Sequence, residues 1–83
     1  MDMSNFTEFE LYKLILCVGL AQKEMQIRLL NHDIWLSGGT PKDTSINWGI
    51  FDRGETTDAL STLSGIELKL KSYYEERFGK SIG

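Results

Sequence analysis

The residues of this chain that could do chemistry are few, and the neighbouring pair His32 and Asp33 is the first of them. A histidine beside a carboxylate could act as a general base with the group that orients it. Adjacent residues rarely face each other, however, and the sequence places no nucleophile or second acid to complete the set. We therefore expect His32 to lie at the C-terminal end of a helix, where it interacts with the helix dipole, and we expect no catalytic residue.

The single cysteine, Cys17, lies in the middle of an apolar run. A reactive thiolate needs exposure and positively charged neighbours, so this position predicts a small buried hydrophobic side chain. With one cysteine and one histidine, the chain cannot form an intrachain disulfide and lacks the four Cys or His ligands of a typical structural zinc site. The sequence therefore indicates no metal and no cofactor.

Two segments contain the residue types that bind anions or nucleotides. Residues 37–42 combine two glycines, hydroxyl groups and a lysine, although they do not form a Walker A motif. Near the C-terminus, basic residues alternate with aromatic ones, as in sites for nucleotides or single-stranded nucleic acid, but three glutamates interrupt them. These residues are Lys69, Lys71, Tyr73, Tyr74, Arg77, Phe78 and Lys80. An ordinary turn and a packed, charged helix explain both segments without a ligand.

The length and charge of the chain limit the classes of protein to which it can belong. Its 83 residues suffice for one domain, residues 1–83. Nine Lys and Arg against twelve Asp and Glu give a net charge of −3, which argues against binding to duplex nucleic acid. The longest apolar stretch, residues 11–21, contains Lys13 and is shorter than the ~20 residues of a membrane span. Because the N-terminus also lacks a basic signal region, we expect a cytoplasmic protein without membrane contact.

Two helices are predicted from their start and stop signals. The first covers residues 7–30: Thr7 and Glu10 form a capping box, and Asn31 suits a left-handed cap. The second covers residues 55–78, with Asp52 or, later in the chain, Thr56 or Thr57 as N-cap. Gly79 is a suitable residue just after its end. Its apolar residues form a single stripe, Ala59, Leu63, Ile66, Leu70, Tyr73 and Tyr74.

The linker, residues 31–54, holds the one proline and both tryptophans. A structureless loop of this length is unusual in a small domain. Ile46, Trp48 and Ile50 alternate with polar residues and glycine, as in a strand, so the linker forms either a small two-stranded hairpin or a loop held by its tryptophans. At least one of Trp35 and Trp48 is expected to be buried. The predicted fold is mainly α, an antiparallel two-helix hairpin with a long ordered linker.

The first helix has two apolar seams, each with spacings of three and four residues. The first seam comprises Leu11, Ile15, Val18, Met25 and Leu29, interrupted by Gln22. The second seam comprises Phe9, Leu16, Leu20, Ile27 and Leu30, interrupted by Lys13 and Lys23. Because the single stripe of the second helix can cover one seam, the linker, a second copy or another protein must cover the other. A domain this small is marginally stable alone, so self-association through the second seam is favoured.

The sequence thus predicts a non-enzymatic interaction protein, a homo-oligomer that acts as a stoichiometric inhibitor or adaptor of another macromolecule. Short chains of this kind are often encoded by phages and other mobile elements. The linker residues Trp35, Lys42, Asp43 and Trp48 are candidates for contact with the partner or ligand, because ordered loops often carry recognition. The alternative function is binding or sequestration of a nucleotide in a pocket between subunits.

Overall fold

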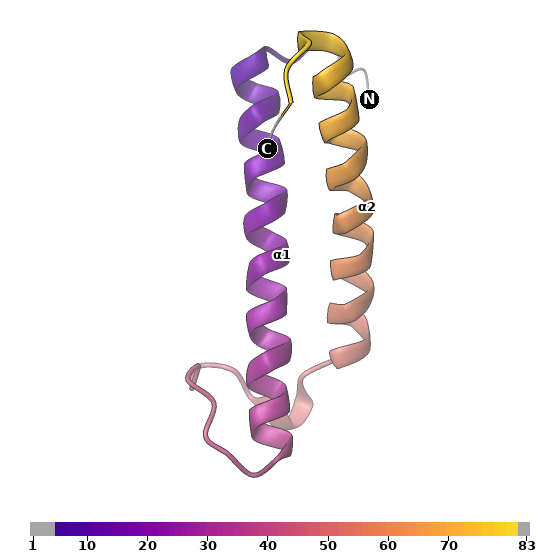
Figure 1. The fold of residues 1–83 in the computed structure, drawn as a ribbon. Helices are drawn as coiled ribbons and strands as arrows, with labels where there is room; N and C mark the ends of the chain where they lie inside the picture. Colours follow the sequence, from indigo (N-terminus) through magenta and orange to yellow (C-terminus); the bar gives the residue numbers. More distant parts are fainter. Residues whose placement is uncertain (1–4, 82–83) are drawn as a thin grey trace.

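The computed structural model, which describes residues 5–81, is a long helical hairpin (Figure 1). Helix α1 (Glu8–Leu36) and helix α2 (Arg53–Phe78) run antiparallel side by side, and the linker between them contains a short 3₁₀ helix, η2 (Trp48–Ile50). The hairpin is an elongated rod with principal extents of 49 × 20 × 18 Å. The mainly α class and the hairpin of the sequence prediction are therefore confirmed.

The start of α1 is the capping box expected from the sequence. The Glu10 N–H donates to Thr7 Oγ1 at 3.1 Å, and the Thr7 N–H donates to Glu10 Oε1 at 3.0 Å. Phe6 packs against the core cluster that contains Leu11, as a hydrophobic staple does. These contacts fix where α1 begins and direct the preceding chain onto the core.

The end of α1 was predicted wrongly, because the helix continues past Leu30 to Leu36. Asn31 is not a left-handed cap. The positive φ instead occurs at Gly38, with φ of 90°, where the Gly38 N–H donates to Trp35 O and the Gly39 N–H donates to Ile34 O. These two hydrogen bonds form a Schellman motif, which satisfies carbonyl groups that a helix end leaves free. The pair of glycines at 38 and 39 was therefore the stop signal.

Helix α2 begins at Arg53, two residues before the predicted start at 55. Of the three N-caps that the sequence offers, the structure uses Asp52, whose Oδ1 accepts a hydrogen bond from the Glu55 N–H at 2.9 Å. The helix ends at Phe78, as predicted, and Gly79 adopts the left-handed conformation with φ of 65°. Only the start of this helix was placed too late.

The core lies between the two helices near the end of the rod where α1 begins and α2 ends (Figure 1). It comprises Leu11 and Ile15 of α1 with Leu70 and Tyr74 of α2. Farther along the contact, a polar pair replaces the apolar layer: Gln22 Nε2 donates to Glu67 Oε2 at 3.2 Å. The first seam of α1 therefore faces α2, and Val18, Met25 and Leu29 are half-buried there.

The linker is ordered by side-chain hydrogen bonds, and residues 5–81 contain no strand, so the two-stranded hairpin, one of the two alternatives for the linker, is wrong. Trp48 is 5% exposed and its indole N–H donates to the carbonyl of Asp43 at 2.9 Å. Asn31 Oδ1 accepts from the Lys42 N–H at 2.9 Å. The alternation at Ile46, Trp48 and Ile50 thus marks a short helical turn around a buried tryptophan. The expectation that at least one tryptophan is buried is confirmed.

Candidate functional site

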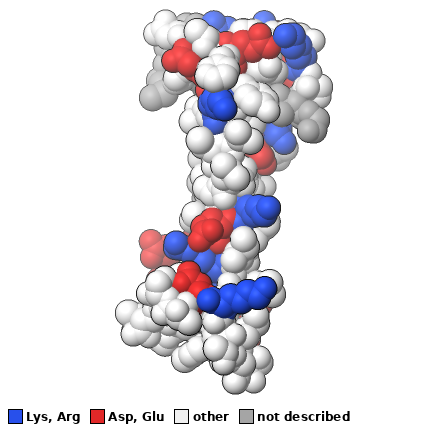
Figure 2. All heavy atoms as spheres, turned by 90° about the vertical axis from the view of Figure 1, so that its left-hand side faces the viewer, with Lys and Arg blue, Asp and Glu red and all other residues white. Residues whose placement is uncertain are grey.

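The second seam of α1 is a set of large apolar side chains that the hairpin leaves uncovered. Its five members are between 44% and 67% exposed: Phe9, Leu16, Leu20, Ile27 and Leu30. They lie on the side of α1 that points away from α2, because the first seam occupies the side that packs on α2. Figure 2 looks at this outer side and shows uncharged surface over the middle of the rod, between two groups of charged side chains. Large exposed apolar side chains that gather on one face are typical of an interaction site.

The linker does not cover the second seam. It packs against the last turns of α1, where Asn31 and His32 are buried at 6% and 8% exposure. Leu20 and Leu30 both remain 60% exposed. A linker that folded back over the seam was the main alternative to an intermolecular contact, and the structure does not show such closure.

Two lysines lie within the second seam and divide it into sections. Lys13 and Lys23 are both exposed, and the Lys13 Nζ lies 5.2 Å from the centroid of the Phe9 ring. A lysine stem can cover apolar surface while its ammonium group stays in water. The lysines therefore permit burial of the seam, but they restrict what can lie opposite them, since a second positive charge would be repelled.

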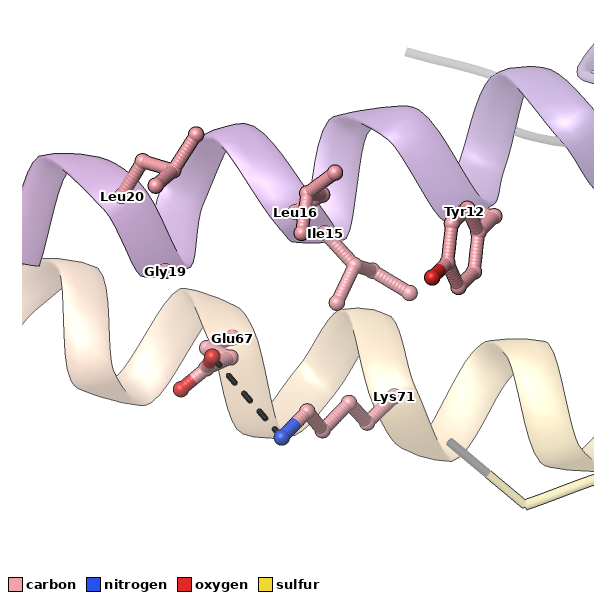
Figure 3. Close-up of a pocket in the computed structure, with 7 residues that line it drawn as sticks. All are labelled: Tyr12, Ile15, Leu16, Gly19, Leu20, Glu67 and Lys71. Atoms are coloured by element: carbon pink, nitrogen blue, oxygen red, sulfur yellow. Dashed lines mark ion pairs between the residues drawn. The ribbon is translucent and has the colours of Figure 1, made fainter. Parts of the chain in front are cut away.

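Beside the second seam, a shallow groove of about 280 Å³ runs between the helices (Figure 3). Its floor includes Ile15, which points toward α2, while Leu16 and Leu20 point away from α2 along its edge (Figure 3). On the α2 side, Lys71 Nζ lies 3.8 Å from Glu67 Oε1. Glu67 also accepts the hydrogen bond from Gln22, so both charged groups of the groove have partners within the chain. The groove suits an apolar side chain better than a phosphate.

At the linker end, His32 lies inside an aromatic cluster with Trp35, Trp48 and Phe51. The Phe51 ring is the nearest, with its centroid 4.9 Å from that of His32. Arg53 Nη1 lies 3.3 Å from His32 Nδ1 and 2.8 Å from Asp33 Oδ1. Because a guanidinium group can only donate, this contact makes Nδ1 an acceptor and places the proton of a neutral His32 on Nε2.

The cluster around His32 therefore joins the end of α1 to the start of α2, which is a structural role. His32 and Asp33 both contact Arg53, the first residue of α2. Arg53 is the residue that the sequence reasoning missed. A charged residue directly after an N-cap is common on any helix, so the sequence held no signal for this contact.

The predicted partner-binding residues of the linker have different environments. Trp48 is buried and holds the linker in place, whereas Trp35 is 42% exposed and Lys42 is exposed. The carboxylate of Asp43 accepts hydrogen bonds from Ser45 Oγ at 2.6 Å and from the Ser45 N–H at 2.9 Å. The Ser45 side chain, and then its backbone, hold the pKa of Asp43 below its usual value. Trp35 and Lys42 are thus presented to solvent, while Trp48 and Asp43 contribute to the internal structure of the linker.

The structure contradicts the predicted burial of Cys17, and it exposes the apolar side chains of Leu36 and Ile50. Cys17 is exposed and not buried, because it lies on α1 between the two seams. Leu36 and Ile50, at 60% and 79% exposure, form apolar surface at the linker end that the sequence reasoning did not single out. Their exposure depends on how the linker turns, which the spacing of apolar residues does not determine.

The described part of the chain shows neither a group of metal-binding side chains nor a helix that could span a membrane. Residues 5–81 contain no group of three or more His, Cys, Asp or Glu side chains that could hold a metal ion. Within the same residues, neither helix is long and apolar enough to cross a membrane.

Comparison of the chain with protein-family models, curated proteins and solved structures found no match. The functional argument therefore depends on the geometry of this chain alone.

Proposed function

We propose that this chain is a non-enzymatic interaction protein of the cytoplasm that self-associates through the second seam of α1 and acts stoichiometrically on another macromolecule. The observation that carries the proposal is the exposure of five large apolar side chains along one face of α1. Burial of such surface stabilises an association by about 25 cal/mol per Å² removed from water, before the entropic costs of association. A hairpin whose own core is small gains stability from this contact.

Self-association is tested by light scattering coupled to size-exclusion chromatography. The wild-type chain is expected to elute at a mass of at least twice 9.5 kDa. The double variant Leu16→Glu with Ile27→Glu is expected to be monomeric, because carboxylates buried in an apolar contact without partners are strongly unfavourable. The matched control is Leu68→Glu, since Leu68 is 66% exposed on α2, away from the seam. A wild-type monomer at high micromolar concentration would contradict the proposal.

Nucleotide sequestration is the second candidate, and the groove beside the second seam is where it can be tested. The presence of Lys71 there favours it, but the contact of Lys71 with Glu67 disfavours it. A thermal-shift screen with ATP, GTP and their diphosphates separates the two candidates, because a bound ligand raises the melting temperature. The interaction proposal expects no shift with any nucleotide. A shift that is lost in Lys71→Ala, but not in Lys69→Ala, would favour sequestration.

A further inference from the structure

The second seam and its two lysines form one continuous series of positions along α1. The series Phe9, Lys13, Leu16, Leu20, Lys23, Ile27, Leu30 has spacings of four and three in strict alternation. Such a seven-residue repeat is the spacing of a coiled coil, in which two helices pack with a left-handed supercoil. A helix of similar length and matching spacing is therefore the occupant that fits this face.

We propose that the occupant is the second seam of another copy of this chain, with the two α1 helices antiparallel. In the proposed register, Leu20 lies opposite the partner's Lys23, and Ile27 lies opposite the partner's Leu16. The two-fold axis then passes between residues 21 and 22 of each α1. This inference rests on the self-association proposed above and specifies its geometry.

The positions of the lysines favour this register. A parallel pair would place Lys13 against the partner's Lys13 and Lys23 against the partner's Lys23. An antiparallel pair displaced by one heptad toward the N-terminus would place Lys13 against the partner's Lys23. In the proposed register each lysine instead lies opposite a leucine, because Lys13 meets the partner's Leu30. The Lys23 ammonium group can then approach the partner's Glu24, about 6 Å along the axis from the partner's Leu20, while Glu24 also pairs with Arg28 of its own helix at 3.3 Å.

The length of α1 favours the same register for an independent reason. Helix α1 covers Glu8–Leu36, so its midpoint is close to residue 22 and the proposed axis lies at its centre. The two helices then overlap along their full length, whereas a displacement by one heptad leaves one end of each seam uncovered. Covering the second seam in both copies buries on the order of 1,000 Å², the size at which specific interfaces begin.

The register is tested with Cys17, the one cysteine of the chain, and the variant Glu24→Cys. Cys17 and Glu24 are both exposed on the same flank of the second seam. In an antiparallel pair, the flank of one α1 helix that carries Cys17 and Glu24 faces the same flank of the other α1 helix. Cys17 therefore approaches position 24 of the other copy. Oxidation with oxidised glutathione is expected to give a disulfide-linked dimer, and peptide mass spectrometry should identify the linkage between Cys17 and position 24. Within one chain these positions are about 10 Å apart along the helix, too far for a disulfide.

Two controls show whether the linkage reports the register. Adding Cys17→Ser to Glu24→Cys is expected to abolish the linked dimer, and Glu76→Cys, on the exposed side of α2, is expected to give none.

Spin labels on Cys17 of the otherwise unaltered chain give a second measurement, with the two labelled positions about 14 Å apart along the common axis. A dimer linked between two copies of Cys17, or between the two introduced cysteines at position 24, overturns this register and leaves self-association standing. Spin labels that lie at the same height along the common axis also overturn this register and leave self-association standing. A monomeric mass for the wild-type chain overturns both the register and the proposed self-association.

Discussion

The two faces of α1 carry apolar side chains at similar spacings, yet the hairpin buries one face and exposes the other. On the first seam, Leu11 is 0% exposed and Ile15 is 3% exposed. On the second seam, Leu20 and Leu30 are each 60% exposed. Helix α2 explains the difference, because its own packed residues form one stripe and cover one face. Apolar spacing therefore shows which faces need cover, and the fold of a single chain shows which face still lacks it.

The largest effect that tests this comparison is expected from Leu11→Ala set against Leu20→Ala. Removing a fully buried leucine side chain costs about 2–5 kcal/mol of unfolding free energy, because it also leaves a cavity. In the dilute monomer, Leu20→Ala is expected to change the free energy of unfolding by less than about 0.5 kcal/mol, as surface substitutions do. Urea unfolding at low protein concentration measures both values. Equal losses in the two variants would show that the second seam is covered within one chain.

The start signals of both helices could be predicted from the sequence, because capping involves residues that are close in the chain. Thr7, Glu10 and Asp52 all act as their types and spacing indicate. The end of α1 was missed because Asn31, a plausible cap by type, is instead buried and receives a hydrogen bond from the linker backbone at Lys42. That contact joins residues eleven apart, and its presence depends on the path of the linker.

The candidate site was predictable only in part. The five residues of the second seam were identified from spacing, and the structure leaves all five exposed. Burial of Cys17 was predicted wrongly, because its neighbours along the chain are apolar while its position around the helix falls between the seams. The aromatic cluster around His32 could not be predicted, since it needs the linker to bring Trp48 and Phe51 against α1.

A smaller effect is expected from Asn31→Ala, which separates the role of the linker from that of the second seam. Asn31 is 6% exposed, donates to Ile27 O and accepts from the Lys42 N–H, both at 2.9 Å. Leaving the Lys42 N–H without this partner is expected to cost about 1–3 kcal/mol. The emission of Trp48 should shift to the red, while the mass of the assembly should not change. A change in mass would show that the linker takes part in the contact, and Asn47→Ala, at an exposed cap, is the control.

Gly65→Ala is expected to raise stability by up to about 1 kcal/mol, because alanine favours a helix interior more than glycine does. A Cβ atom at Gly65 would meet nothing within 4 Å, so the hairpin has room for it. The control is Gly38→Ala, which is expected to lower stability because Gly38 has a φ of 90°. Thermal unfolding measures both. Loss of assembly in Gly65→Ala would show that this face of α2, and not the second seam alone, contacts another chain.

The smallest effect is expected at the polar contacts beside the first seam, where Glu8 joins α1 to the end of α2. Glu8 Oε1 accepts from Lys80 Nζ at 2.9 Å and from Tyr74 Oη at 2.8 Å. The hydrogen bond from Lys80, followed by that from Tyr74, lowers the pKa of Glu8 below its usual value. The ionised carboxylate therefore favours the folded state at a pH above the pKa of Glu8 in the unfolded chain. This contribution is lost as the pH falls through the lowered pKa of the folded state.

The variant Glu8→Gln should accordingly lose little stability at neutral pH, because exposed ion pairs contribute weakly and salt screens them. Its melting temperature should fall less steeply than that of the wild type on acidification, since it lacks one carboxylate that must be protonated. Comparing the two chains cancels the contributions of Glu10 and Asp43, whose pKa values are also lowered. Glu76→Gln, at an exposed position of α2, is the matched control. Parallel acid curves for wild type and Glu8→Gln would show that Glu8 does not link the helices in solution, and that apolar packing of the first seam alone holds this end of the hairpin.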